Sequence, residues 1–289
     1  MAYKSSPRPV FEGPTKIPYD QVTRHLWGEP EAGMVDDWIY VSSDKIHQLV
    51  FGLPPGDGFR HSEAFRTVFA ADEVLYVLQG CMLIANPETG EVHLVRKGES
   101  AFFRRDTWHH AWAWEGQELR VLEFFAPPPS TGSSGKYAQT RPYVDRSRYQ
   151  RDELLGRWPA DRADAEARAT IRVLREADRL WSLDPSDPRV LTGLIASTEH
   201  LTAGTVRLAP GGRSQVLRHG GALGLYVLEG RVNVLLTDEA RDPPVWFELQ
   251  AADGFYVPEG ASYRVFNMGG EPAGYAFGVA PAFAPTEAS

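Results

Sequence analysis

Short runs of residues that alternate between apolar and polar, or that are rich in β-branched and aromatic side chains, recur along most of this chain. Turn-forming Pro, Gly and Asn separate these runs, which in the first half include residues 46–53, 73–78, 100–103 and 120–125. A second series extends from residue 193 to residue 279. A period of two predicts β-strands, and many short strands spaced by turns predict a sandwich or a barrel. We therefore expect an all-β fold.

One segment has a different pattern. Residues 127–135 are rich in Pro, Ser and Gly, which is the composition of a linker. Between Asp161 and Trp181, apolar residues recur with the period of an α-helix, and Arg and Glu lie between them. We expect one helix here, which packs as a bridge between two β-domains.

Three motifs occur twice, in the same order. They are residues 53–58 and 208–213, 76–80 and 226–230, and 98–103 and 252–257, each pair about 150–155 positions apart. A shared offset this long indicates a duplicated domain. The prediction is an N-terminal arm (1–40), an N-terminal barrel (41–128), a linker with a helix (129–190) and a C-terminal barrel (191–289).

Composition narrows the classes of partner. The formal net charge of −8 and the pI near 5.5 argue against nucleic acid, which needs a basic face. The single Cys81 excludes an intramolecular disulfide and a Cys-rich zinc site. The chain shows neither an apolar leader nor a run long enough to cross a membrane. We expect a cytoplasmic protein that binds neither nucleic acid nor a membrane.

The candidate chemistry is a set of imidazoles and carboxylates on separate strand-like runs of the first half. His61 and Glu63 follow a Pro-Gly turn, and their spacing places both on one face of a strand. Glu73 begins the next apolar run, and His109 follows a later one. If the sheet closes on itself, these groups converge, and a mixed set of nitrogen and oxygen donors suits a divalent metal ion.

The spacing of these residues resembles that of the cupins. Glu73 precedes Gly80 by the interval that is typical of the first cupin motif, and Gly98 precedes His109 by the interval of the second. Residues 258–260 and Asn267 fit the second motif of the C-terminal copy. Because the motifs occur twice, the chain is similar to the bicupins.

This resemblance implies two tandem jelly-roll β-barrels, joined by a linker that contains one α-helix. It also implies a divalent metal ion in the N-terminal barrel, with Fe(II) favoured and Mn, Ni or Zn as alternatives. The implied metal ligands are His61, Glu63, Glu73 and His109. Cupins often form dimers through sheet edges, so we expect a homodimer.

The second copy lacks most of these ligands. Leu217, Leu223 and Tyr263 stand at three of the four ligand positions, and His219 alone remains. We expect no metal ion in the C-terminal barrel, and we expect His219 to form a hydrogen bond with Tyr263. A structural or interface role follows for this barrel.

The function that the resemblance implies is a metal-dependent bicupin enzyme with a small-molecule substrate. We expect a non-haem Fe(II)-type dioxygenase that acts on a small aromatic or enolic compound. The alternatives are a metal-dependent isomerase, decarboxylase or lyase that acts through an enolate, and a metal-free cupin that binds a small molecule. Aromatic and basic residues of the first barrel are the candidates for substrate binding: Tyr76, Phe102, Arg104, Trp108 and Trp112.

Overall fold

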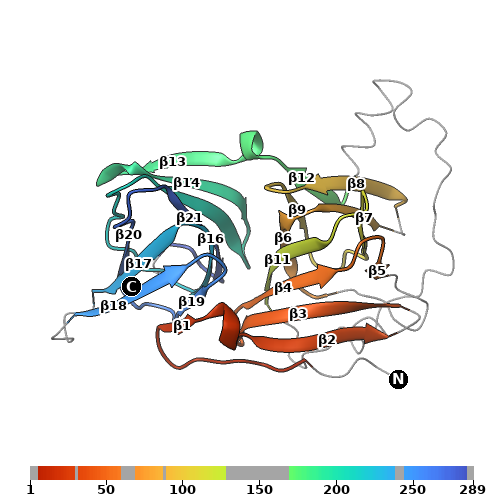
Figure 1. Ribbon diagram of the computed structural model, residues 1–289, viewed down its shortest axis with the longest axis horizontal. Coiled ribbons are helices and arrows are strands. Elements are labelled where there is room, and N and C mark those ends of the chain that lie inside the picture. The colour runs from red at the N-terminus through yellow and green to blue at the C-terminus, as the bar shows by residue number, and fades with distance from the viewer. Residues whose placement is uncertain are drawn as a thin grey trace.

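The computed structural model consists of two β-barrels that lie side by side (Figure 1). It describes residues 6–29, 32–59, 69–86, 89–127, 169–237 and 244–284. The expected all-β fold with two tandem barrels is confirmed. In the described ranges no helix has the length and apolar character needed to span a bilayer.

The N-terminal barrel is made of a seven-stranded and a four-stranded antiparallel sheet. The large sheet has the order β12-β9-β6-β11-β4-β3-β2, and the small sheet has the order β5-β10-β7-β8. The bounds of the large sheet's strands, in that order, are Ile171–Leu174, Ser100–Phe103, Asp72–Gln79, Leu119–Ala126, His47–Leu53, Gly33–Ser42 and Thr23–Glu29. Those of the small sheet are Gly58–Phe59, His110–Ala113, Cys81–Asn86 and Glu91–Arg96.

The C-terminal barrel repeats this plan. Its large sheet has the order β1-β19-β16-β21-β15-β14-β13, and its small sheet has the order β18-β17-β20. The strands of the large sheet are Thr15–Ile17, Gly254–Val257, Ala222–Glu229, Ala273–Ala280, Thr202–Leu208, Asp187–Ser197 and Leu180–Asp184. Those of the small sheet are Val245–Gln250, Arg231–Leu236 and Tyr263–Phe266.

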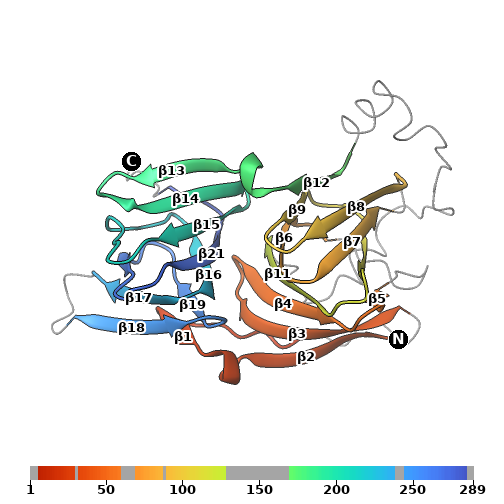
Figure 2. The ribbon, with the colours of Figure 1, turned by 45° about the horizontal axis from the view of Figure 1, so that its top comes forward.

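Each repeat begins with a short strand that belongs to the other barrel. Strand β1 lies before the N-terminal barrel in the sequence, but it pairs with β19 of the C-terminal barrel. Strand β12 lies before the C-terminal barrel, but it pairs with β9 of the N-terminal barrel. A one-turn 3-10 helix follows each of them, η1 (Tyr19–Gln21) and η2 (Glu176–Asp178). The exchange is therefore reciprocal, and Figure 2 shows both crossing segments.

The expected helix over residues 161–181 is wrong in its described part. Residues 161–168 lie outside the described residues, and the rest of the segment forms β12, η2 and the start of β13. The physical reason is tertiary pairing. Strands β12 and β13 each complete the edge of a large sheet through backbone hydrogen bonds, which outweigh a local helical pattern.

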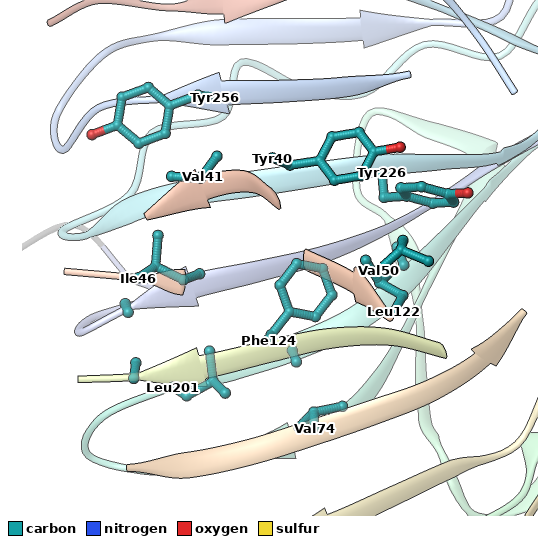
Figure 3. Close-up of a cluster of buried hydrophobic side chains, with 14 of the residues drawn as sticks. Tyr40, Val41, Ile46, Val50, Val74, Leu122, Phe124, Leu201, Tyr226 and Tyr256 are labelled. Atoms are coloured by element: carbon teal, nitrogen blue, oxygen red, sulfur yellow. The ribbon is translucent and has the colours of Figure 1, made fainter. Parts of the chain in front are cut away.

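The two large sheets pack against each other through a shared apolar cluster (Figure 3). Phe124 lies in this cluster and packs directly against Gly278 of the other barrel. If residue 278 had a Cβ atom, that atom would lie only 2.6 Å from the Phe124 ring. The Tyr40 hydroxyl donates a hydrogen bond of 2.7 Å to the Ala252 carbonyl in the other barrel. The two barrels therefore share one core in addition to their own.

Alternation along the strands decides which residues face which core. Leu75 and Val77 of β6 lie in the interior of the N-terminal barrel, whereas Val74 and Tyr76 pack in the cluster between the barrels. Strand β11 follows the same rule. Consequently, the odd-numbered residues of these two strands point into the barrel.

Candidate active site in the N-terminal barrel

Two glutamates stand at odd-numbered positions of these strands and therefore face the barrel interior. Glu73 on β6 is 1% exposed, and Glu123 on β11 is also buried. In the β6–β11 ladder Glu123 lies opposite Leu75, and Phe125 lies opposite Glu73, so the two glutamates are diagonal neighbours. Two carboxyl groups thus lie close together inside an apolar barrel.

Burial determines the protonation of this pair. Desolvation raises the pKa of Glu123 to about 7, while a hydrogen bond with Glu73 lowers it in part. Desolvation, with the charge of Glu123 and the same hydrogen bond, raises the pKa of Glu73 well above its usual range. The pair therefore retains a proton near neutral pH. Asp37 on β3 is a third buried carboxyl, whose pKa is raised by burial and then by Glu123.

One oxygen of this pair has no partner. Among the described residues, none forms a hydrogen bond with the buried Glu73 Oε2. A buried polar atom without a partner costs about 1–3 kcal/mol. The carboxylate therefore has unused capacity to accept a hydrogen bond or to bind a cation.

His109 enters the same interior from the loop before β10. Its Nδ1–H donates a hydrogen bond of 3.3 Å to the Thr107 carbonyl, and burial lowers the pKa of His109 to about 4. The imidazole is therefore neutral at physiological pH, which is the form that binds metal ions. Its ring packs 4.6 Å from that of Phe103, which lies opposite Glu73 in the β6–β9 ladder. Glu73 and His109 thus border the same phenylalanine.

A tight turn places His109. Asp106 has a left-handed backbone with φ of 68°, and its N–H donates to the Phe69 carbonyl. The counterpart in the second barrel is Gly260, with φ of 76°. An Asp residue tolerates this conformation better than most side chains do. The turn is therefore retained in the N-terminal barrel even though residues 104–106 lack its Pro and Gly.

The proposed four-ligand set remains a prediction. His61 and Glu63 lie outside the described residues. Within the part of the chain that the structure describes, no three His, Cys, Asp or Glu side chains form a group that could hold a metal ion. Glu73 and His109 therefore need further donors.

The structure places the five predicted substrate-binding residues away from the barrel interior. Tyr76 and Phe102 pack on the opposite face of the large sheet, at the cluster between the barrels. Arg104 forms ion pairs with Asp72, at 3.1 Å, and with Glu199 of the other barrel. The charge of Arg104 is therefore paired with carboxylates at the junction of the barrels.

The rings of Trp108 and Trp112 both pack edge-on against His110, with ring centroids 5.7 and 5.6 Å from the imidazole. On β10 the residues that join the barrel core are Ala111 and Ala113. His110 and Trp112 consequently point to the other face of the small sheet.

The corresponding position in the C-terminal barrel has no carboxylates. Leu223 and Phe277 occupy the places of Glu73 and Glu123, and they line a cavity of about 40 Å³. His219 donates from Nδ1 to the Phe283 carbonyl at 2.7 Å and accepts at Nε2 from the Tyr263 hydroxyl at 2.9 Å. The predicted His219–Tyr263 hydrogen bond is confirmed. Both imidazole nitrogens are therefore satisfied by the protein.

The sequence analysis missed Glu123 and Asp37. A signal existed for Glu123, because it is the one acidic residue in the otherwise mostly apolar strand β11. Asp37 lies in β3 beside a second aspartate, Asp36, which is exposed. Their sequence therefore gives no indication of which of the two is buried.

Comparisons with known proteins agree with this architecture. Residues 204–277 match the model of the cupin domain family. No curated protein sequence matches this chain significantly. The C-terminal barrel thus matches a cupin domain, and the N-terminal barrel repeats its strand order.

Solved structures share the fold of the whole chain at low identity. A Pseudomonas aeruginosa protein described as glyoxylate induced superposes with a TM-score of 0.62 at 18% identity, covering 96% of this chain and 92% of its own. An oxalate decarboxylase from Lactobacillus farciminis, solved as a formate complex, gives 0.61 at 14%, covering 98% and 89%. AerE from Microcystis aeruginosa gives 0.59 at 7%, covering 90% and 97%. At these identities the likeness shows the fold alone.

Proposed function

We propose that the N-terminal barrel binds a divalent metal ion, and that the protein is a metal-dependent enzyme that cleaves a small oxygen-rich acid, as a decarboxylase or another lyase does. The observation that carries this proposal is Glu73, a carboxyl group that is 1% exposed and has one oxygen without a partner. Such a group is costly unless a cation or a ligand binds it.

The chemistry of the described donors fits such an ion. Burial raises the pKa of Glu73, so a metal ion would have to displace its proton, after which Glu73 would supply a carboxylate oxygen. His109 would supply a neutral imidazole, and such a donor pair suits Mn(II), Fe(II), Ni(II) or Zn(II). His61 and Glu63 are the proposed remaining ligands. A bound ion would act as a Lewis acid toward the substrate's oxygen atoms.

The other residues of the barrel have separate roles in this proposal. The Glu73–Glu123 pair holds a proton near neutral pH, and Glu123 would keep that proton once a cation binds Glu73. Phe103 and Phe59 enclose the His109 ring and exclude water from this part of the barrel. A protonated carboxyl in an apolar site is suited to general acid catalysis.

Cleavage is favoured over dioxygenation because oxalate decarboxylases are among the solved structures with this two-barrel fold. The Fe(II)-type dioxygenase remains the second candidate. The two reactions differ in a simple observable, since a decarboxylase releases CO2 and a dioxygenase consumes O2.

Metal analysis of the purified protein tests the proposal. Cells grown with added manganese or iron should give about one metal ion per chain, the number that one mononuclear site holds. The Glu73→Gln and His109→Ala variants should lose the ion. His93→Ala is the matched control, because His93 lies on β8, where it is hydrogen bonded to Glu91.

The reaction class is tested next. CO2 release and O2 uptake are measured with oxalate and with other small carboxylic acids. A wild-type protein that contains no metal under any growth condition would refute the proposal and would favour the metal-free binding barrel. Oxygen uptake with the metal-loaded protein would favour the dioxygenase.

A further inference from the structure

A second pocket, of about 440 Å³, lies between the two barrels. It is outside the N-terminal barrel interior, because Tyr76 and Leu78 line it from the face of β6 opposite to Glu73. Its volume is within the range of small-molecule sites. Four cationic side chains line it, whereas Glu229 is the one acidic residue among its described lining residues; the cations are Lys97, Arg120, Arg179 and Arg207.

Arg179 is the central feature of this pocket. It lies between η2 and β13, on the segment that crosses from one barrel to the other (Figure 2). It is 7% exposed, and its guanidinium donates hydrogen bonds to the Gly98 carbonyl and, at 3.1 Å, to the Thr205 hydroxyl. The guanidinium also packs 5.6 Å from the centre of the Tyr76 ring.

These contacts leave Arg179 without a direct ion pair, and the nearby charge of Glu176 is already paired with Arg207. No carboxylate in the described ranges forms an ion pair with it, and its buried Nε has no hydrogen-bond acceptor there. Burial of an unpaired charge is strongly unfavourable. An anion bound in the pocket would remove this cost.

The neighbouring arginines differ from Arg179. Arg207 pairs with Glu176 at 2.7 Å, and Arg120 pairs with Glu118 at 2.9 Å. Both are partly exposed at the edge of the pocket. Each of these two charges is partly balanced by its glutamate, and Lys97 adds another cation to the lining of the pocket. The remaining positive field attracts anionic ligands, even in a protein whose net charge is −8.

We infer that the pocket between the barrels is a binding site for a small anionic metabolite that carries a carboxylate or phosphate group. Arg179 provides the buried charge, and Arg207 and Arg120 provide the outer positive charges. Tyr76 and Tyr226 line the pocket with aromatic surface beside these charges. This site is independent of the proposed metal ion, because none of its residues is a candidate ligand.

Calorimetric titration of the purified full-length protein at constant ionic strength tests the inference. Inorganic phosphate and citrate are titrated separately, and the comparison decides between a phosphate and a carboxylate ligand. The wild-type protein should bind at least one of the two with saturation at a single site. Arg179→Gln should weaken that binding about tenfold or more, the scale expected for one charge-assisted contact.

Two further variants make the result decisive. Arg207→Gln changes a half-exposed side chain, should fold normally, and should weaken binding severalfold. Arg231→Gln removes the same charge from a side chain that is 70% exposed and does not line the pocket, and it should leave binding unchanged. Equal binding by all four proteins, or no saturable binding of either anion by the wild type, would overturn the inference. Metal content that is unchanged in Arg179→Gln would confirm that the two sites are separate.

Discussion

The buried carboxyl pair makes a specific prediction about the pH dependence of stability. Glu123 has its pKa raised from the usual 4.5 to about 7 because the folded protein desolvates it. A carboxyl whose pKa is raised on folding stabilises the protein most below the unfolded-state value. That stabilisation is lost as the pH rises through the folded-state value. The metal-free protein should therefore lose stability between about pH 4.5 and about pH 7.

The magnitude follows from the shift. One pKa unit corresponds to about 1.4 kcal/mol, so the rise to about 7 amounts to about 3 kcal/mol. Glu123→Gln removes the titration but keeps the shape of the side chain, and its amide donates a hydrogen bond to Glu73. The difference in unfolding free energy between about pH 5 and about pH 8 should shrink by about 3 kcal/mol in this variant.

The unfolding free energy is measured by urea unfolding in the presence of a chelator, with circular dichroism and tryptophan fluorescence as the two signals. Glu271→Gln is the control, since Glu271 is exposed. Burial lowers the pKa of His47 to about 3, which reduces stability as the pH falls below its unfolded-state value. The His47 contribution to the pH dependence is opposite in sign to that of Glu123, and it is the same in wild type and in both variants. An equal pH dependence in wild type and Glu123→Gln would refute the assignment of a buried, proton-holding pair.

Three other substitutions test the packing. Phe124→Ala should cost about 3–5 kcal/mol in urea unfolding, because the ring fills the cluster between the barrels against Gly278. Tyr40→Phe should cost about 1 kcal/mol through loss of its hydrogen bond to the other barrel. Tyr263→Phe should cost about 1–3 kcal/mol, because the buried His219 Nε2 loses its donor; wild-type stability in any of these variants would contradict the contact that it removes.

The barrels could be predicted from the sequence because the information is local. Alternation, turn residues and the duplicated motifs predict the same set of strands, and most of the strands within the two barrels form there; these patterns do not predict β1, β2, β10, β12 or β13. Which sheet each strand joins is not local. Strand β12 pairs with β9 and β1 pairs with β19, and nothing within either short segment specifies a partner so distant in the sequence.

The residues of the candidate site likewise divide into those that local sequence motifs predict and those that only the assembled fold brings together. Glu73 and His109 could be selected because their spacing from Gly80 and Gly98 follows a motif. Glu123 lies beside Glu73 only because β11 pairs with β6. Arg179 lies in a segment expected to be helical, and its burial depends on Gly98 of one barrel and Thr205 of the other. Such groupings become visible only when both barrels are assembled.

The reciprocal exchange of β1 and β12 has a consequence for how this gene can evolve. A single half, expressed alone, would lack the strand that closes its large sheet and would carry a strand with no sheet to join. Strands β9 and β19 would then present unpaired N–H and C=O groups, which promote aggregation. Natural selection can thus change the interiors of the two copies separately, as Leu223 and Phe277 in place of Glu73 and Glu123 illustrate. It cannot readily delete either copy or exchange it for an unrelated barrel.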